Sequence, residues 1–240
     1  RTARHYVIRE LPQELTKILS ETGISGFTVI PETTKERNGT ITDLRADTHP
    51  FVIYVNYNSI IPETSEYVRP CVKIEISSLS MDEPVETRTL RSFISEAVPD
   101  AEDMEIKFKT VIPTRTFLEK IFLLHEEFQK KNPRSYRMSR HLYDIERIMD
   151  TSFGNEALKD LKLNDEIIAH RNIFNHIDGV DYSSHKHDRI NFIPPAELID
   201  DWRNDYNSLE KHFLYNSATH LSFDQLLDRM LELLKRIRTM

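Results

Sequence analysis

The sequence predicts an α+β protein, in which a strand-rich N-terminal part precedes a helical bundle. Up to residue 112, short runs rich in Val, Ile, Phe and Tyr alternate with Pro, Gly, Asn and Asp, a pattern typical of strands and turns. From Pro113 onward, apolar residues recur at helical spacing. Pro113 itself favours a helix start, because its missing N–H costs little in a first turn. We therefore expect two domains, residues 1–112 and residues 113–240.

The N-terminal part is expected to open with a helix over residues 7–21, which Gly23 closes. Strands are expected where β-branched and aromatic residues gather, at 27–30, 51–57, 71–77 and 104–112. Residues 31–50 predict a loop or hairpin around Asn38-Gly39, a dipeptide typical of tight turns. Residues 81–103 are interpreted as a connector with one short helix.

The C-terminal part is expected to be helical at 114–131, 139–152, 155–176, 195–216 and 222–238, with a long loop over 178–195. The last helix has a recognisable start, because Ser222 and Gln225 have the spacing of a capping box. An apolar stripe then runs along it, formed by Leu226, Leu227, Met230, Leu233, Leu234 and Ile237.

Composition limits the class of protein. Apolar residues make up 39% and charged residues 30%, as in folded soluble chains. The net charge of −7 argues against a general basic surface for nucleic acid, while it leaves room for a local basic cleft. Cys71 is the single cysteine, so an internal disulfide is excluded. No run approaches the roughly 18–20 apolar residues that span a bilayer. We expect a cytoplasmic protein that does not enter the membrane.

Lys120 is the first candidate functional residue, within "TRTFLEKIFLLHEEFQ" (114–129). It lies among apolar residues on the expected helix, one turn after Thr116 and on the same face. One interpretation is that its methylenes cover apolar surface while the ammonium reaches water. The other is that Lys120 points into a cleft and binds phosphate oxygens. The segment alone leaves both open.

Two further segments carry candidate charges. In "CVKIEIS" (71–77), Val72, Ile74 and Ile76 should face a core, and Lys73 and Glu75 should project from the opposite face of the strand. In "SRHLYDIERIMD" (139–150), Arg140 and Asp144 are one helical turn apart. Each pair could also be an ordinary solvated pair. "HKHD" (185–188) is interpreted as a solvated loop, because its histidine spacing does not match structural zinc sites.

The order of these motifs resembles the AbiEii/AbiGii-type nucleotidyltransferase toxin family. The resemblance rests on "KIE" on a strand, "TFLEK" opening a helix, "RHLYD" on the next helix and the segment "WRNDYNSLEKHFLYNSATHLSFDQLLDRMLELL", and it covers roughly residues 5–240. It implies an incomplete nucleotidyltransferase-fold mixed sheet joined to a helical bundle, with an NTP bound between them. Members act as toxins in toxin–antitoxin pairs or phage defence, and some transfer nucleotides to RNA, including tRNA.

The resemblance also implies roles for individual residues. Lys120 would grip the triphosphate, and Asp144 would act as a base or as the partner of Lys120. Glu75 would act near a catalytic Mg²⁺. Substrate would be bound by Lys73, Thr116 and Arg140. The partners implied are an NTP, an RNA, tRNA or protein acceptor, and a cognate antitoxin.

The sequence departs from the family pattern at the metal site. The family begins with a Gly-Ser turn and a DxD pair that binds Mg²⁺, whereas this sequence contains neither. We expect the strand pair that carries them to lie outside this chain, and the chain alone to be inactive, because nucleotidyl transfer depends on metal positioning of the triphosphate. The alternative is a non-catalytic nucleotide- or protein-binding module that has lost the metal site. A third interpretation is a helical interaction protein whose charges are all solvated.

Overall fold

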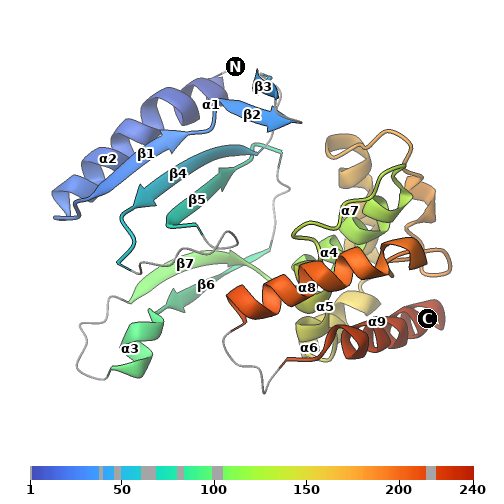
Figure 1. Ribbon diagram of the computed structural model, residues 1–240. Helices are drawn as coiled ribbons and strands as arrows, with labels where there is room; N and C mark the ends of the chain where they lie inside the picture. The colour runs from blue at the N-terminus through green and yellow to red at the C-terminus, as the bar shows by residue number, and fades with distance from the viewer. Residues whose placement is uncertain are drawn as a thin grey trace. The chain divides into compact units, whose positions relative to one another are not determined.

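A computed structural model describes residues 2–37, 40–45, 50–60, 69–79, 84–98, 105–214 and 220–240. The chain divides into two compact units, residues 1–80 and residues 81–240 (Figure 1). This division falls earlier in the chain than the domain boundary predicted between residues 112 and 113, which stays a prediction. Among the described helices, none is long and apolar enough to cross a membrane.

The first unit opens with helical turns that differ from the single helix predicted. A short α1 (Thr2–His5) continues into a π-helical turn, η1 (Tyr6–Glu10), and then into α2 (Leu11–Glu21). Pro12 lies at the start of α2. Because proline has no N–H, the chain cannot continue a regular α-helical ladder through it, and a wider turn precedes it. Gly23 follows α2 with φ of 80°, the left-handed conformation that glycine adopts without strain.

A three-stranded sheet supports α2 in this unit. Its order is β1 (Phe27–Pro31), β4 (Phe51–Tyr57), β5 (Cys71–Ile76), and both pairs are antiparallel. A small core forms between the sheet and the helical turns, from Val7, Phe51 and Ile53 with partly buried Leu11, Leu15, Val29, Ile74 and Ile76. The hairpin β2 (Thr34–Arg37) and β3 (Thr40–Asp43) confirms a hairpin in this segment, while its predicted turn, residues 38–39, lies outside the described residues.

The second unit begins with a hairpin that was only half predicted. β6 (Val85–Leu90) pairs with β7 (Ile106–Val111), and α3 (Phe93–Ala97) lies between them, capped by Ser92. The sequence predicted β7 and the short helix but not β6. In "VETRTL" apolar residues occur only at the ends, so the alternation that indicates a strand is missing. Every strand pair among the described residues is antiparallel, so the mixed sheet that the resemblance implies is not seen there. The α+β class is confirmed.

Six longer helices follow: α4 (Pro113–Gln129), α5 (Ser139–Met149), α6 (Ser152–Lys159), α7 (Leu161–Phe174), α8 (Ile199–Phe213) and α9 (Phe223–Arg238). Short 3-10 turns η2 (Tyr182–Ser184) and η3 (Ala196–Leu198) occur in the segment before α8. The predicted helix over 155–176 is divided at Asp160. Its side chain accepts a 2.9 Å hydrogen bond from the Leu163 N–H, so it caps α7. The capping box of α9 is confirmed.

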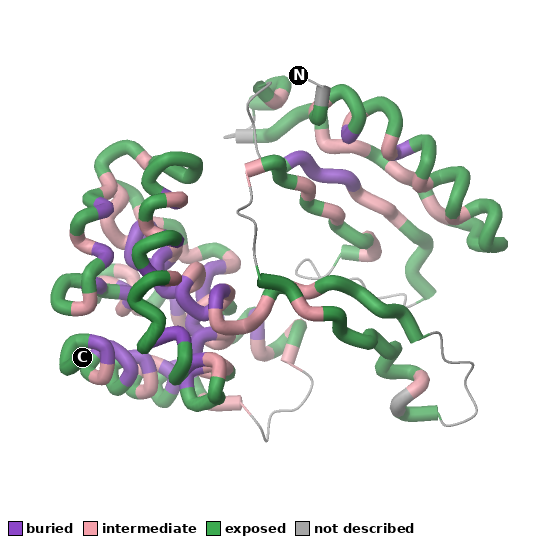
Figure 2. The backbone as a smooth tube through the Cα atoms, turned by 180° about the vertical axis from the view of Figure 1, so that it is seen from behind, coloured by how far each residue is buried: buried purple, intermediate pink, exposed green. Residues whose placement is uncertain are grey.

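The buried core of the second unit is centred on α4, which packs against α5, α6 and α7, while α5 also contacts α8 and α9. Figure 2 shows buried segments concentrated in these helices. The largest fully buried side chains of this unit are Trp202, Tyr206, Phe117, Phe122, Phe192, Leu118, Ile121, Leu124, Leu142, Ile145 and Met149. Gly154 lets α6 approach the end of α5, because a Cβ there would lie 2.5 Å from the Ile148 carbonyl oxygen. Burial on this scale supplies most of the stability of the helices.

Candidate functional site

The site is built on α4, whose apolar residues occupy most of its circumference. Phe117, Leu118, Ile121 and Leu124 are all at most 2% exposed, because neighbouring helices cover more than one side of α4. Polar residues on such a helix can only point along the seams between its neighbours. Lys120 lies on one of these seams, facing α5.

Lys120 and Asp144 form an ion pair in which the Nζ and Oδ2 atoms are 2.6 Å apart. The Lys120 side chain is 21% exposed and that of Asp144 is 39% exposed. The Lys120 side chain is therefore bound by protein at its ammonium and partly exposed as a whole. This arrangement differs from the solvated interpretation, in which the ammonium would extend into water, and the phosphate-binding interpretation stays a prediction.

His141 is a second partner of Lys120 that the sequence analysis did not select. Its Nδ1 lies 3.5 Å from the Lys120 Nζ. Burial, followed by the positive charges of Lys120 and Arg140, lowers the pKa of His141 from 6.5 to about 3. The imidazole is thus neutral at pH 7 and can accept a hydrogen bond. His141 precedes Asp144 by three residues, so helical spacing alone would have placed both on one face.

Two carboxylates hold the connection from α4 to α5 in place. Asp205 of α8 accepts hydrogen bonds from the Ser139 N–H at 2.9 Å, the Ser139 hydroxyl at 2.6 Å and the Arg137 N–H. Glu127 of α4 accepts from Arg134 Nη2 and Lys130 Nζ, both at 2.7 Å. Although burial acts in the opposite direction, these hydrogen bonds lower the pKa of Glu127 to about 2. The first turn of α5, which carries Arg140 and His141, is therefore anchored from both sides.

Thr116 and Arg140 lie near this cluster in the fold but are not part of its hydrogen bonding. Thr116 is partly exposed one turn before Lys120 on α4. Arg140 is exposed, and within the described residues no hydrogen bond or ion pair engages its guanidinium, although its charge acts on His141. The second unit holds four predicted site residues, and the structure brings two of them, Lys120 and Asp144, into direct contact. Arg140 supplies an exposed cation close to them.

Lys73 and Glu75 belong to the first unit, where they project from β5 on the face opposite its core. Their side chains contact each other and are about half exposed. Ile74 and Ile76 pack on the core as predicted, but Val72 is 56% exposed, so the prediction that it faces a core is wrong. The core residues of this unit contact β5 at its C-terminal end, which leaves Val72 uncovered.

Side chains that can bind a metal ion are scattered among the described residues of the chain. These residues contain no group of three or more His, Cys, Asp or Glu side chains that could hold a metal ion. The one predicted candidate, Glu75, has its carboxylate engaged by Lys73. Mg²⁺ is usually held by one or two carboxylates together with substrate phosphates and water, and Glu75 would supply one such carboxylate.

A second polar face of α4 is sealed inside the helical unit. Arg171 of α7 donates to Glu126 through Nε at 2.7 Å and Nη2 at 2.5 Å, and it also contacts Glu119. Arg115 donates to Glu119 at 2.9 Å. Burial alone would raise the pKa of Glu126, but hydrogen bonds from Arg171 and His185 hold it below its usual value. Paired buried charges of this kind stabilise the fold only as a complete set.

His185 corrects the interpretation of "HKHD" as a solvated loop. The residue is 1% exposed, and its Nε2 lies 3.3 Å from Glu126 Oε1. Its ring stacks on Tyr182, with centroids 5.1 Å apart, and meets His125 edge-on at 4.8 Å. A loop histidine can therefore be buried in a core where a buried carboxylate lies next to it. The spacing of apolar residues in the sequence does not reveal such a contact.

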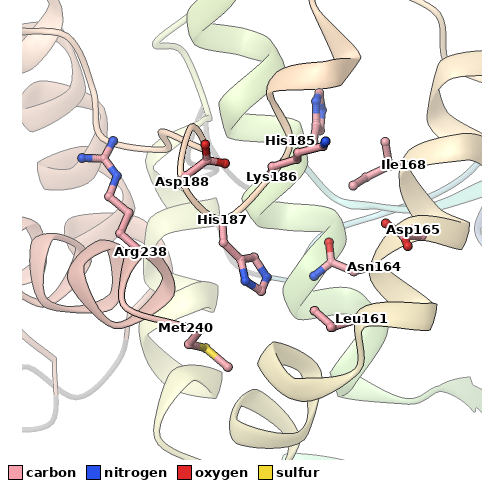
Figure 3. Close-up of a pocket in the computed structure, with 10 residues that line it drawn as sticks. All are labelled: Leu161, Asn164, Asp165, Ile168, His185, Lys186, His187, Asp188, Arg238 and Met240. Atoms are coloured by element: carbon pink, nitrogen blue, oxygen red, sulfur yellow. The ribbon is translucent and has the colours of Figure 1, made fainter.

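A pocket of about 420 Å³ lies beside this loop, between α7 and the end of α9 (Figure 3). It is lined by Leu161, Asn164, Asp165, Ile168, His185, Lys186, His187, Asp188, Arg238 and Met240. Asn164 and His187 point toward its centre (Figure 3), whereas its charged residues are exposed. None of the six predicted site residues lines it, so it is a hollow distinct from the Lys120 seam.

Comparison with known proteins bears on the chain as a whole. The family model for the nucleotidyl transferase AbiEii toxin of type IV toxin–antitoxin systems matches residues 2–229. The match extends over both compact units and includes all six predicted site residues. No curated protein matches the sequence.

Proposed function

This chain belongs to the AbiEii nucleotidyl transferase toxin family of type IV toxin–antitoxin systems, and from that premise we propose that it transfers a nucleotide from an NTP to an RNA, tRNA or protein acceptor. The observation that carries the proposal is the Lys120 ammonium, which is held 2.6 Å from Asp144 on a side chain that is 21% exposed. Because Asp144 already fixes its position, the ammonium can bind an incoming phosphate without a prior rearrangement. The family implies a nucleotide substrate and a cognate antitoxin.

The chemistry needs positive charge at one defined place. In nucleotidyl transfer, an acceptor hydroxyl oxygen bonds to the α-phosphorus, the bond from that phosphorus to the bridging oxygen breaks, pyrophosphate leaves, and the hydroxyl proton passes to solvent. Negative charge is spread over phosphate oxygens throughout, so a fixed cation beside them stabilises the transition state. We assign this role to Lys120. Lys73, Thr116 and Arg140 remain predicted substrate-binding residues.

Asp144 is better suited to hold Lys120 than to remove a proton. Its carboxylate is already paired with the ammonium, with Oδ2 2.6 Å from the Lys120 Nζ, so the oxygen that would accept a proton is occupied by Lys120. We therefore propose Asp144 as the partner of Lys120. The two roles predict different results for Asp144→Asn. An asparagine can still accept a hydrogen bond from Lys120 and so keep part of the activity, whereas it cannot act as a base.

Dependence on Mg²⁺ and a role for Glu75 near it also remain predictions. The described residues contain no group of three or more His, Cys, Asp or Glu side chains placed to hold a metal ion. When bound, Mg²⁺ would neutralise and orient the triphosphate. Cytoplasmic location and a part in phage defence are likewise predictions from the sequence.

The direct test is to incubate the complete gene product with each α-³²P-labelled NTP, Mg²⁺ and total RNA, with EDTA as a parallel arm. We expect one NTP to label an RNA or protein species, and EDTA to abolish the label. Saturable NTP binding without labelled product would favour the alternative, a non-catalytic binding module. Neither binding nor labelling with any NTP would contradict the proposed function.

A further inference from the structure

The starting point is the number of hydrogen bonds that the Lys120 ammonium can donate. An ammonium has three N–H groups. Asp144 Oδ2 accepts one at 2.6 Å, and His141 Nδ1 lies within reach of a second at 3.5 Å. Among the described residues these are its two partners. Two fixed acceptors define the rotation of the ammonium, and the third N–H is left for a ligand.

His141 can serve as an acceptor only when its ring is neutral. A protonated imidazole carries N–H on both nitrogens, so it would repel Lys120 and compete for Asp144. The groups that act on it are Lys120 and Glu127 from α4, Arg134 from the following loop, and Arg140 beside it. Three of these four are cations, and the ring is largely buried, so the neutral form is strongly favoured. Its proton then lies on Nε2, and the Nδ1 lone pair faces Lys120.

The backbone beneath His141 is also fixed. Asp205 accepts hydrogen bonds from the Ser139 N–H and hydroxyl, two residues before His141. Arg137, just outside the helix, has φ of 56°, a conformation that a non-glycine residue keeps only where the surroundings hold it. The imidazole is therefore presented from a rigid first turn and not from a mobile loop.

We propose that His141 is a positioning residue whose neutral Nδ1, together with Asp144, orients the Lys120 ammonium for phosphate binding. The inference rests on the proposed function for its purpose, although the hydrogen bond itself does not. His141 is poorly suited to proton transfer for two reasons. Its Nδ1 is occupied by Lys120, and its lowered pKa makes the ring a poor base. The inference extends the site by a residue that none of the sequence predictions included.

The test compares two substitutions in the complete gene product. His141→Phe keeps a ring but removes the acceptor, whereas His141→Asn places an amide oxygen near the position of Nδ1. We expect His141→Phe to weaken NTP binding about tenfold, seen in Kd and KM more than in kcat, and His141→Asn to remain within about threefold of the wild type. His176→Phe, at an exposed histidine, should change nothing. In a Lys120→Met background, His141→Phe should have little further effect.

Three outcomes would overturn the inference: wild-type binding by His141→Phe, equal loss in both His141 variants, or additive loss with Lys120→Met. A readout without nucleotide separates this inference from the proposed function. In ¹⁵N NMR of histidine-labelled protein, His141 should stay a neutral Nε2–H tautomer at pH 5, and Lys120→Met should raise its pKa. If this holds but no NTP binds, the hydrogen bond stands and the proposed function fails. If His141 is protonated at pH 5, the inference fails whatever binds.

Discussion

The two polar faces of α4 carry the same kinds of charge in very different surroundings. On one face, Glu126 and Arg171 have side chains that are 1% and 9% exposed. On the other, Lys120 and Asp144 are 21% and 39% exposed. The comparison teaches that position on a helix does not separate a structural ion pair from a candidate site. Access to solvent, and the number of partners that each charge has within the protein, separate them.

On the sealed face of α4, which carries Glu119 and Glu126, the charged groups form hydrogen bonds mainly with other side chains of the protein. Arg171 serves two carboxylates, and Glu126 is also contacted by His185. Removing one member would leave a buried charge uncompensated, which is far more harmful than losing an exposed pair. The Lys120 face keeps one N–H of the ammonium available. Its removal should therefore affect ligand binding more than folding.

The largest expected effect is on stability, from Arg171→Met. This change leaves Glu119 and Glu126 without their shared cation, and we expect the free energy of unfolding to fall by about 3–5 kcal/mol. Urea denaturation followed by circular dichroism measures it. The matched control is Arg203→Met, which breaks a two-point pair with Asp224 at the surface and should lower the free energy of unfolding far less than Arg171→Met. Similar losses for both arginines would contradict the contrast between the two environments.

The next effect is on binding and transfer, from Lys120→Met. Loss of the ammonium should reduce kcat/KM for the NTP by about 100-fold, as for removal of one electrostatic donor in a transition state. The free energy of unfolding should change by no more than about 1 kcal/mol, since the pair is partly exposed. Lys162→Met on α7 is the control, because Lys162 is 87% exposed and pairs only with the neighbouring Glu166 at 3.6 Å in the described chain. A variant that keeps activity, or that unfolds, would remove the basis for treating this face as functional.

The smallest expected effect is the pH dependence of stability. Burial, aided by nearby positive charge, lowers the pKa of His125 to about 4 and of His141 to about 3, from 6.5. At pH values between 6.5, the pKa in the unfolded chain, and the lowered pKa in the folded chain, the unfolded chain binds more protons than the folded chain. The stability that is present above pH 6.5 is therefore lost as the pH falls. We expect a loss of about 1–2 kcal/mol per pH unit between pH 6 and 4.5.

Urea titrations at pH 7, 6, 5 and 4.5 would measure this slope, and His141→Phe should make it shallower because one of the two depressed histidines is gone. Glu127, whose pKa is lowered to about 2 from 4.5, adds its own loss only at lower pH, as the pH falls below about 4.5. An unfolding free energy that stays constant from pH 7 to 4.5 would show that both histidines titrate normally.

Local pattern predicted the elements of the site better than its contacts. The helix start at Pro113, the helix that carries Asp144 and the capping box of α9 all follow from nearest-neighbour chemistry, and the structure has them. The strand β6 was missed because its residues do not alternate in polarity. The break at Asp160 was missed because a capping aspartate within a long helical pattern resembles an ordinary surface residue.

By itself the sequence determined the family, through the order of its motifs along the chain. It also determined the α+β class and most of the elements, since these depend on residue types at short spacing, and it predicted Lys120 and Asp144 as site residues. Only the tertiary structure decided that His141 would meet Lys120 across 21 residues, and that His185 would be buried against Glu126 across 59. Helical periodicity specifies which residues share a face. It does not specify which other element covers that face, and that depends on how the buried side chains of several helices pack together.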